Sequence, residues 1–246
     1  MSSFLDRRIV VARSAQRAAP LLERLRAAGA KVSSVELTTS MAPSDGGEAL
    51  RAAAERIDDF DWLLLSSARG VDALDSHPEL KRARRIAVVG PTTEAALEQR
   101  GCRADIVASG TGGVELADLV LEQRPDSGPL LFVGAQSPAG GLVERLTAAG
   151  REVVQAASYQ TVPRDLHDDE IQLVKTAEIM VVAAPSGVAA LHNRPTGRDL
   201  VMVATGPTTS RAARDAGFRV VEAATPAIDD LIEALERGVE MFESTS

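Results

Sequence analysis

The chain has 246 residues, of which 45% are hydrophobic, a size that fits one large or two ordinary globular domains. Its formal net charge of -8 and its isoelectric point near 5.0 argue against nucleic-acid and membrane-surface binding, which normally need a basic face. A single cysteine rules out an intrachain disulfide framework, and no apolar run approaches the roughly 18 residues of a membrane span. Because the start also lacks the pattern of a signal peptide, a cytoplasmic protein is expected.

Short apolar runs alternate with amphipathic stretches along the chain. Runs that are apolar on both faces are typical of interior parallel strands. A glycine closes the intervening stretches, at the place of a left-handed C-terminal cap. The sequence therefore predicts an α/β protein with parallel sheets and right-handed crossovers. The predicted strands lie at residues 9–11, 31–37, 62–65, 86–89, 130–133, 179–182 and 201–203, and the closing glycines are Gly29, Gly101, Gly150 and Gly217.

An internal repeat divides the chain into two related halves. The tetrapeptide Gly90-Pro91-Thr92-Thr93 returns unchanged as Gly206-Pro207-Thr208-Thr209, each time between an apolar run and an Ala-rich stretch. Other matches keep the same order and nearly the same spacing, which indicates duplication. The offsets are 121 from Gly29 to Gly150, 117 from Gly70 to Gly187, and 116 from Gly90 to Gly206.

Two stretches interrupt the alternation at matching places in the halves, residues 38–43 and 158–163, and both are interpreted as linkers. If the chain crosses between lobes at each linker, residues 41–158 form one lobe, while residues 1–37 and 163–246 form the other. Two related lobes joined by two linkers predict a hinge with a ligand cleft between the lobes.

The two Gly-Pro-Thr-Thr turns are candidate anion sites. Glycine allows a sharp turn after the strand, proline suits the first helical position, and the threonine hydroxyls and free N–H groups point out of the helix start. Such a start favours carboxylates or phosphates. The alternative is that these turns only connect a strand to a helix, and the sequence leaves both interpretations open. The candidate residues are Gly90, Thr92, Thr93, Gly206, Thr208 and Thr209.

Polar residues follow other predicted strands at their carboxyl ends, where open α/β sheets bind ligands. Helix capping by the serines is the alternative there, and it is compatible with ligand contact. Arg13 follows the first strand, and it either meets an acidic ligand or forms a surface ion pair. The other candidates of this kind are Ser66, Ser67 and Arg69 in the first half, and Pro185, Ser186 and Gly187 in the second.

Tyr159 is the only tyrosine, and it lies in the second linker rather than in a predicted strand or helix. A phenol beside a cleft can donate a proton or hold a leaving hydroxyl, or it can simply pack its ring and hydrogen-bond its hydroxyl. The three histidines have no Cys or His partner at ligand spacing, so no metal site is predicted. Dinucleotide, phosphate-loop and serine-hydrolase motifs are lacking, which removes the usual support for those chemistries.

In their order and spacing these segments resemble the uroporphyrinogen-III synthase family. The resemblance covers nearly the whole chain. It implies two flavodoxin-like α/β lobes joined by a two-stranded linker, with the active site in the cleft. It also implies that hydroxymethylbilane is cyclised to uroporphyrinogen III with loss of water and inversion of the last pyrrole ring, without a metal or organic cofactor. The resemblance is carried by the strand ending in Arg13, residues 61–68, both Gly-Pro-Thr-Thr turns, residues 159–163 and Pro185-Ser186-Gly187-Val188.

The resemblance also assigns roles and partners. It places the family's conserved tyrosine on Tyr159, as the group that assists departure of the substrate hydroxyl, and its threonines on Thr93 and Thr209. A polycarboxylate substrate suits helix-start amides, hydroxyls and arginines. The expected partners are the tetrapyrrole substrate and, transiently, the preceding enzyme of the pathway, with no nucleic acid and no membrane. A monomer is expected because neither linker shows a long apolar seam.

Four places depart from the family pattern. Ser66-Ser67-Ala68-Arg69 stands in place of Thr-Ser-x-Asn, Ala183-Ala184 in place of a second Thr-Ser pair, Ser14 in place of proline, and Gly134-Ala135 in place of Arg-Gly. The lost hydroxyls weaken the second site, and Arg69 is a candidate source of compensating charge. Two alternative functions remain open: a non-catalytic two-lobed protein that binds a tetrapyrrole or another anionic small molecule, and a nucleotide-dependent transferase.

Overall fold

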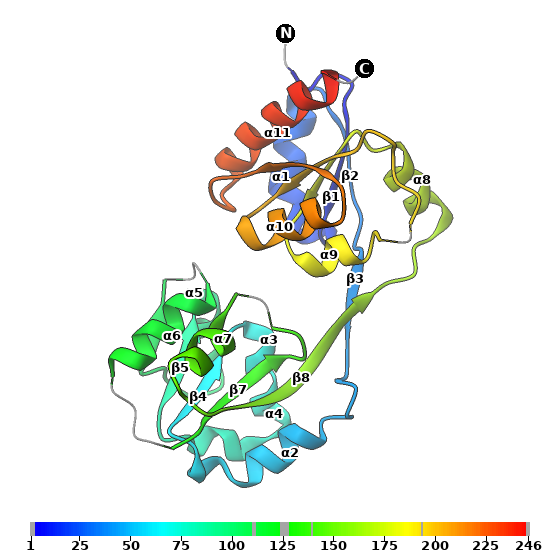
Figure 1. The fold of residues 1–246 in the computed structure, drawn as a ribbon. Coiled ribbons are helices and arrows are strands. Elements are labelled where there is room, and N and C mark those ends of the chain that lie inside the picture. The colour runs from blue at the N-terminus through cyan, green and yellow to red at the C-terminus, as the bar shows by residue number, and fades with distance from the viewer. Residues whose placement is uncertain (1–2, 110–111, 124–127, 139, 193, 245–246) are drawn as a thin grey trace. The chain divides into compact units, whose positions relative to one another are not determined.

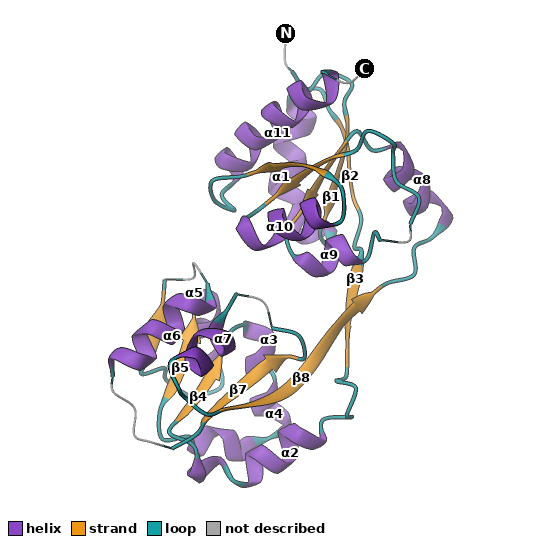
Figure 2. Ribbon diagram, in the orientation of Figure 1, coloured by secondary structure: helices purple, strands orange, loops and turns teal. Residues whose placement is uncertain are grey.

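A computed structural model of the chain describes residues 3–109, 112–123, 128–138, 140–192 and 194–244. The chain divides into two compact units. Unit 1 comprises Met1–Thr39 and Val162–Ser246, and unit 2 comprises Ser40–Thr161. Both divisions fall inside the two segments, residues 38–43 and 158–163, that interrupt the alternation of strands and helices. Each unit has a parallel sheet between layers of helices (Figures 1 and 2).

Unit 1 contains a five-stranded sheet with the strand order β11-β10-β9-β1-β2. All of its paired strands run parallel. Counted from β2, this is the flavodoxin order 2-1-3-4-5, and the order reverses between β1 and β9. The strands are β1 (Arg8–Ala12), β2 (Lys31–Ser34), β9 (Ile179–Val182), β10 (Val201–Ala204) and β11 (Arg219–Glu222); the helices are α1 (Ala15–Ala27), α8 (Asp168–Thr176), α9 (Pro185–Ala189), α10 (Pro207–Asp215) and α11 (Ile228–Glu243).

Successive side chains along the strands of unit 1 enter two separate cores, because neighbours in a strand point to opposite faces of the sheet. Val11 and Val181 pack on the face that α1 and α11 cover. Val10, Met180 and Met202 pack on the other face with residues of α8, α9 and α10. Since both faces are covered, the central strands β9 and β10 are apolar throughout, which confirms the prediction of interior parallel strands.

Unit 2 contains a six-stranded sheet with the order β3-β8-β7-β4-β5-β6. The neighbours from β8 to β6 run parallel. Without the edge strand β3, the order counted from β6 is 3-2-1-4-5 in chain order, which is a circular permutation of the order in unit 1, and it reverses between β7 and β4. The strands are β3 (Thr38–Met41), β4 (Trp62–Leu65), β5 (Ile86–Val89), β6 (Ile106–Ala108), β7 (Leu130–Ala135) and β8 (Val153–Pro163). The helices are α2 (Glu48–Glu55), η1 (Ile57–Asp59), α3 (Ala68–Val71), α4 (Ala73–Ser76), η2 (Pro78–Arg82), α5 (Pro91–Glu98), α6 (Gly113–Glu122) and α7 (Leu142–Ala148).

The core of unit 2 is also divided between the two faces of its sheet. Leu63 and Leu65 pack with residues of α2 to α5, whereas Leu64 and Phe132 pack with α6 and α7. Trp62, the only tryptophan, belongs to the second group and is 2% exposed. Its fluorescence therefore reports on the folding of unit 2.

The two sheets account for the sequence repeat. The strands β1 and β2 occupy the same places in the sheet of unit 1 that β7 and β8 occupy in the sheet of unit 2. In the same way, β9 to β11 correspond to β4 to β6. The two copies of Gly-Pro-Thr-Thr accordingly begin α5 and α10, which follow corresponding strands. Each half of the sequence thus contributes the first two strands of one sheet and the last three of the other.

Residues 38–43 and 158–163, interpreted as linkers, are partly strands, so the expectation that Tyr159 lies outside any strand is wrong. Thr38–Met41 forms β3, and β8 continues to Pro163, so Tyr159 lies inside a strand. These stretches are polar, and they are extended because β3 and β8 are hydrogen-bonded neighbours in the sheet. Such pairing depends on tertiary context more than on local pattern. The four closing glycines are as predicted, with φ angles of 90°, 75°, 79° and 85° at Gly29, Gly101, Gly150 and Gly217.

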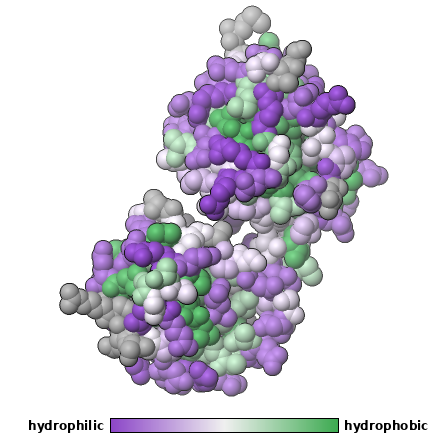
Figure 3. Space-filling view, in the orientation of Figure 1, coloured by the Kyte–Doolittle hydropathy of each residue, from purple (hydrophilic) through white to green (hydrophobic). Residues whose placement is uncertain are grey.

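The surface on the face drawn in Figure 3 is largely hydrophilic, with apolar residues visible between polar ones. Among the described residues, the large hydrophobic side chains that are exposed belong to Leu5, Met41 and Val114. None of the helices in the described ranges is long and apolar enough to cross a membrane.

The start of α8 in unit 1 is stabilised by a carboxylate. Glu170 accepts a hydrogen bond of 3.0 Å from the backbone N–H of His167 and forms an ion pair with Arg164. The His167 N–H is the larger cause, and with Arg164 it holds the pKa of Glu170 below its ordinary value of 4.5. Because the folded pKa is the lower one, this stabilisation is fully present above the unfolded pKa and is lost as pH falls through the folded pKa.

Glu170→Gln is expected to lower the free energy of unfolding of unit 1 by about 1 kcal/mol at neutral pH. The difference from wild type should shrink as pH falls below about 4.5, where the wild-type carboxylate becomes protonated. Hydrogen exchange of α8 peptides measures this in unit 1 itself. Glu233→Gln is the control, because Glu233 is an exposed glutamate on α11. A difference that stays constant down to acid pH would contradict the assignment.

Candidate active site

The strands of unit 2 end together at the carboxyl edge of its sheet. The register pairs Leu65 of β4 with Val88 of β5 and with Val133 of β7. Ser66 and Ser67 follow directly after β4. Because the strand order reverses between β4 and β7, these serines lie where open α/β sheets bind ligands.

Tyr159 is brought to this part of unit 2 by a β-bulge in β8. The register pairs Gly134 with Ala157 and then Ala135 with Tyr159, which leaves Ser158 as the extra residue. The Ser158 hydroxyl donates to the Gly134 carbonyl oxygen at 3.2 Å. A bulge of this kind bends the strand and changes the direction of the next side chain. The position of Tyr159 therefore depends on an irregularity that the sequence pattern does not reveal.

The side chain of Tyr159 contacts residues of α3. Its hydroxyl lies 3.4 Å from the Ser67 hydroxyl, which also accepts a hydrogen bond of 3.2 Å from the Gly70 N–H. The guanidinium carbon of Arg69 lies 5.1 Å from the centre of the Tyr159 ring, and Arg69 also donates to the Ser40 hydroxyl. Ser67 thus caps α3, which is one of the two interpretations that the sequence left open, and it also faces Tyr159; its contact with a ligand stays a prediction. Ser40 was not predicted, because no sequence signal distinguishes it within β3.

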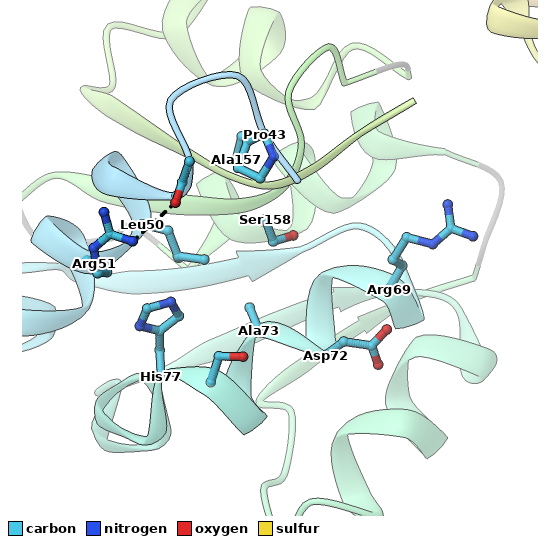
Figure 4. Close-up of a pocket in the computed structure, with 12 residues that line it drawn as sticks. Pro43, Leu50, Arg51, Arg69, Asp72, Ala73, His77, Ala157 and Ser158 are labelled. Carbon is cyan, nitrogen blue, oxygen red and sulfur yellow. Dashed lines mark hydrogen bonds between the residues drawn. The ribbon is translucent and has the colours of Figure 1, made fainter. Parts of the chain in front are cut away.

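A pocket of about 350 Å³ adjoins this cluster in unit 2 (Figure 4). Arg69 and Ser158 line it, together with Arg51 and His77 from the far end. The view shows the Arg69 guanidinium turned away from Asp72, whose carboxylate instead pairs with Arg100 at 2.8 Å. The positive charge of Arg69 is therefore available to other groups.

The two Gly-Pro-Thr-Thr turns each present one threonine to solvent and bury the other. Thr92 and Thr208 are exposed, whereas Thr93 and Thr209 are 3% and 4% exposed. The structure thus differs from the expectation that both hydroxyls of each turn point outward. The second threonine occupies the third position of the helix, on the face that packs inward. The second threonine is buried to nearly the same extent in both units, as expected for two copies of a repeat.

Arg13 lies at the corresponding edge of unit 1. The register places Ala12 and Ala204 beside Val182, so β1, β9 and β10 end together. Arg13 follows β1, is half-buried and forms no ion pair with any residue that the structure describes. Burial, and then the positive charge of Arg17, lower the pKa of Arg13 from its ordinary value. Of the two alternatives for Arg13, the surface ion pair is thus not what the structure contains.

The remaining candidates of unit 1 form the start of α9, which is a short helix. Pro185, Ser186 and Gly187 are all half-buried, and Ala184 caps the helix without a side-chain hydrogen bond. A residue that the sequence analysis missed supplies a hydroxyl here. Thr205 is 8% exposed and donates to the Ala183 carbonyl oxygen at 3.3 Å, which ties the end of β10 to the end of β9.

Unit 1 has the flavodoxin strand order, unit 2 has a circular permutation of it, and both carry polar groups where the order reverses. These features define the class of two-domain α/β proteins that act on small molecules at the carboxyl ends of their strands. An arginine without an acidic partner suits an anionic ligand, and the phenol beside a serine suits proton donation. Within the described ranges, no three His, Cys, Asp or Glu side chains gather in a metal-binding group.

Comparison with known proteins identifies the family. The profile of the family Uroporphyrinogen-III synthase HemD matches residues 23–233. The chain belongs to the uroporphyrinogen-III synthase family, which confirms the resemblance seen in the sequence. It is 27% identical to a uroporphyrinogen-III synthase of Synechococcus elongatus, over 95% of this chain and 96% of that protein. It is 25% identical to the porphyrin biosynthesis protein HemD of Ruminiclostridium josui over 93% of this chain, which spans only 48% of that protein.

Solved structures confirm the fold. The uroporphyrinogen-III synthetase of Helicobacter pylori superposes with a TM-score of 0.63 at 18% identity, over 93% of this chain and 98% of that one. A mutant uroporphyrinogen III synthase of Thermus thermophilus gives 0.59 at 18% identity, over 95% and 99%. At this level of identity the likeness concerns the fold alone.

Proposed function

We propose that this chain closes hydroxymethylbilane into uroporphyrinogen III, with loss of water and inversion of ring D, the last pyrrole ring. The observation that carries the proposal is the cluster of Tyr159, Ser67 and Arg69 at the strand-order reversal of unit 2. It occurs in a chain that the family profile matches over residues 23–233. A phenol held beside a hydroxyl is suited to a reaction whose first event is the departure of a hydroxyl as water.

In this proposal Tyr159 donates a proton to the substrate hydroxyl, which leaves as water and leaves behind an azafulvene cation. The enzyme then confines the chain of pyrroles so that the substituted carbon of the last ring attacks the cation. Proton transfer is the smaller contribution and confinement the larger. Truncation of any single side chain therefore lowers the rate without abolishing it, unlike the loss of a nucleophile.

Donors that suit the carboxylates of the substrate are proposed for each unit by itself. Arg13 supplies an unneutralised charge, and the starts of α5 and α10 supply backbone N–H groups at the positive ends of their dipoles. Thr93 and Thr209, being buried, are proposed to shape these helix starts from inside. The other contacts of the proposed substrate site are Ser66, Ser67, Arg69, Gly90, Thr92, Pro185, Ser186, Gly187, Gly206 and Thr208, of which Gly90 is buried and the rest are exposed or half-buried.

The test is to mix the protein with freshly generated hydroxymethylbilane and to resolve the uroporphyrinogen isomers. Uroporphyrinogen III is the expected product. Type I isomer alone, which forms spontaneously and in a protein-free control, would show that the chain does not catalyse the inversion. Tight binding without conversion would then identify a non-catalytic tetrapyrrole-binding protein.

We further propose that the protein acts as a cytoplasmic monomer that contacts the preceding enzyme of the pathway only transiently. The single cysteine supports a reducing compartment. The net negative charge supports the monomer, because copies of the chain repel one another at neutral pH. Sedimentation equilibrium should give a single species of 25.9 kDa. A dimer mass at micromolar concentration would contradict the monomer.

A further inference from the structure

Among the described residues, Arg69 is the cation whose guanidinium lies over the Tyr159 ring. It lies in α3, its guanidinium carbon is 5.1 Å from the centre of the Tyr159 ring, and it donates to the hydroxyl of Ser40 in β3. No carboxylate in the described part of the chain pairs with it. Asp72, the nearest acidic residue along the chain, is paired with Arg100. The charge of Arg69 thus faces an aromatic ring instead of an acid.

Tyr159 is held at three points. The N–H of Gln136 donates to the Tyr159 carbonyl oxygen at 2.8 Å, which fixes the backbone of β8. Arg69 lies over the ring, and Ser67 lies 3.4 Å from the hydroxyl. The hydroxyl contact is long for an O–H···O hydrogen bond, so it is weak and a bound ligand can replace it. The ring contact remains when that exchange occurs, because it involves a different part of the side chain.

We propose that Arg69 is a positioning residue for Tyr159. Anchored by Ser40, the guanidinium stacks on the ring through a cation–π contact and keeps the phenol hydroxyl beside Ser67, where the substrate hydroxyl is to be protonated. The role rests on the proposed function, because it assigns to Tyr159 the departure of that hydroxyl. It replaces the role of Arg69 as a direct contact of the substrate, which the sequence suggested and which the site proposed above includes.

The two roles predict different kinetics. A positioning residue acts on the reacting geometry, so Arg69→Met should lower kcat about fivefold and leave KM within about twofold. Arg69→Lys should retain part of the kcat that Arg69→Met loses, because an ammonium also makes a cation–π contact. It should not reach the wild-type kcat, because an ammonium lacks the planar guanidinium that stacks on the ring while it bonds Ser40. A carboxylate ligand would show the reverse, with a raised KM and an unchanged kcat.

A second readout needs no substrate. Because Tyr159 is the only tyrosine, protein carrying ring-labelled tyrosine gives a single set of tyrosine ring resonances in NMR spectra. Arg69→Met should shift these resonances, and Ser40→Ala should shift them less in the same direction by releasing the anchor. Arg51→Met is the matched control, because Arg51 lines the same pocket but bonds the Gly46 carbonyl oxygen at 3.1 Å.

The outcomes separate this inference from the proposed function. Shifted ring resonances together with a loss confined to kcat support the positioning role. Unmoved resonances, or a loss confined to KM, overturn it even if the enzyme forms uroporphyrinogen III. If the wild-type protein forms no type III isomer, the proposed function fails and a positioning role in that reaction fails with it. The resonances then show only whether Arg69 orders the tyrosine.

Discussion

Tyr159→Phe is expected to lower kcat about 10- to 100-fold, below most of the roughly 100- to 10,000-fold range of general acids, because confinement is the larger contribution here. The substitution removes only the phenol oxygen. The ring remains under Arg69, and Ser67 keeps its hydrogen bond with the Gly70 N–H, so the local structure should persist. KM should change little, because the proposed substrate contacts are spread over many other groups. Initial rates with hydroxymethylbilane, together with the isomer ratio of the product, measure the effect.

The stability control for this variant is internal. Urea unfolding followed by Trp62 fluorescence reports on unit 2, which contains both Trp62 and Tyr159, and it should give nearly the wild-type midpoint. A long hydrogen bond of 3.4 Å contributes little to stability, so a large shift is not expected. Equal losses of kcat from truncations at many positions, with Tyr159→Phe inert, would count against the role assigned to the phenol.

The fold was accessible from the sequence because both sheets are covered on both faces. Strands such as residues 62–65 and 179–182 are apolar at every position, and this pattern does not depend on knowing their neighbours. The repeat then related the strand ends to one another. What could not be predicted was the extension of β8 through Tyr159, since its polar residues are extended by pairing with β3 and carry no local strand signal.

Residues of the candidate site that directly follow a strand could be predicted. Residues that join the site through contacts between distant parts of the chain were missed. Ser66 and Ser67 follow a recognisable strand, so their place at the edge could be inferred. Ser40 reaches Arg69 across the fold, and nothing in its neighbourhood along the chain indicates this. Thr205 was missed for another reason. At the repeat offset of 116 its counterpart is Val89, so the comparison of the two halves does not single out a hydroxyl at this position.

Gly70→Ala is expected to have the largest effect on stability, lowering the free energy of unfolding of unit 2 by about 1–3 kcal/mol. A Cβ atom at Gly70 would lie 2.9 Å from the backbone carbonyl oxygen of Val133, so α3 must move away from β7. Alanine is otherwise the better helix former by about 1 kcal/mol, and the clash must therefore exceed that gain. Displacement of α3 also moves Ser67 and Arg69, so kcat should fall as well.

Gly187→Ala is the matched control, because the repeat places Gly187 at the corresponding position of α9 in unit 1. There the added Cβ would lie 3.0 Å from a methyl group of Val182, and a side chain can shift where a backbone carbonyl cannot. Its cost should be below about 1 kcal/mol, measured by hydrogen exchange in unit 1, while Trp62 fluorescence measures Gly70→Ala in unit 2. Equal costs for the two variants would mean that the close approach of α3 to β7 does not determine where Ser67 and Arg69 lie.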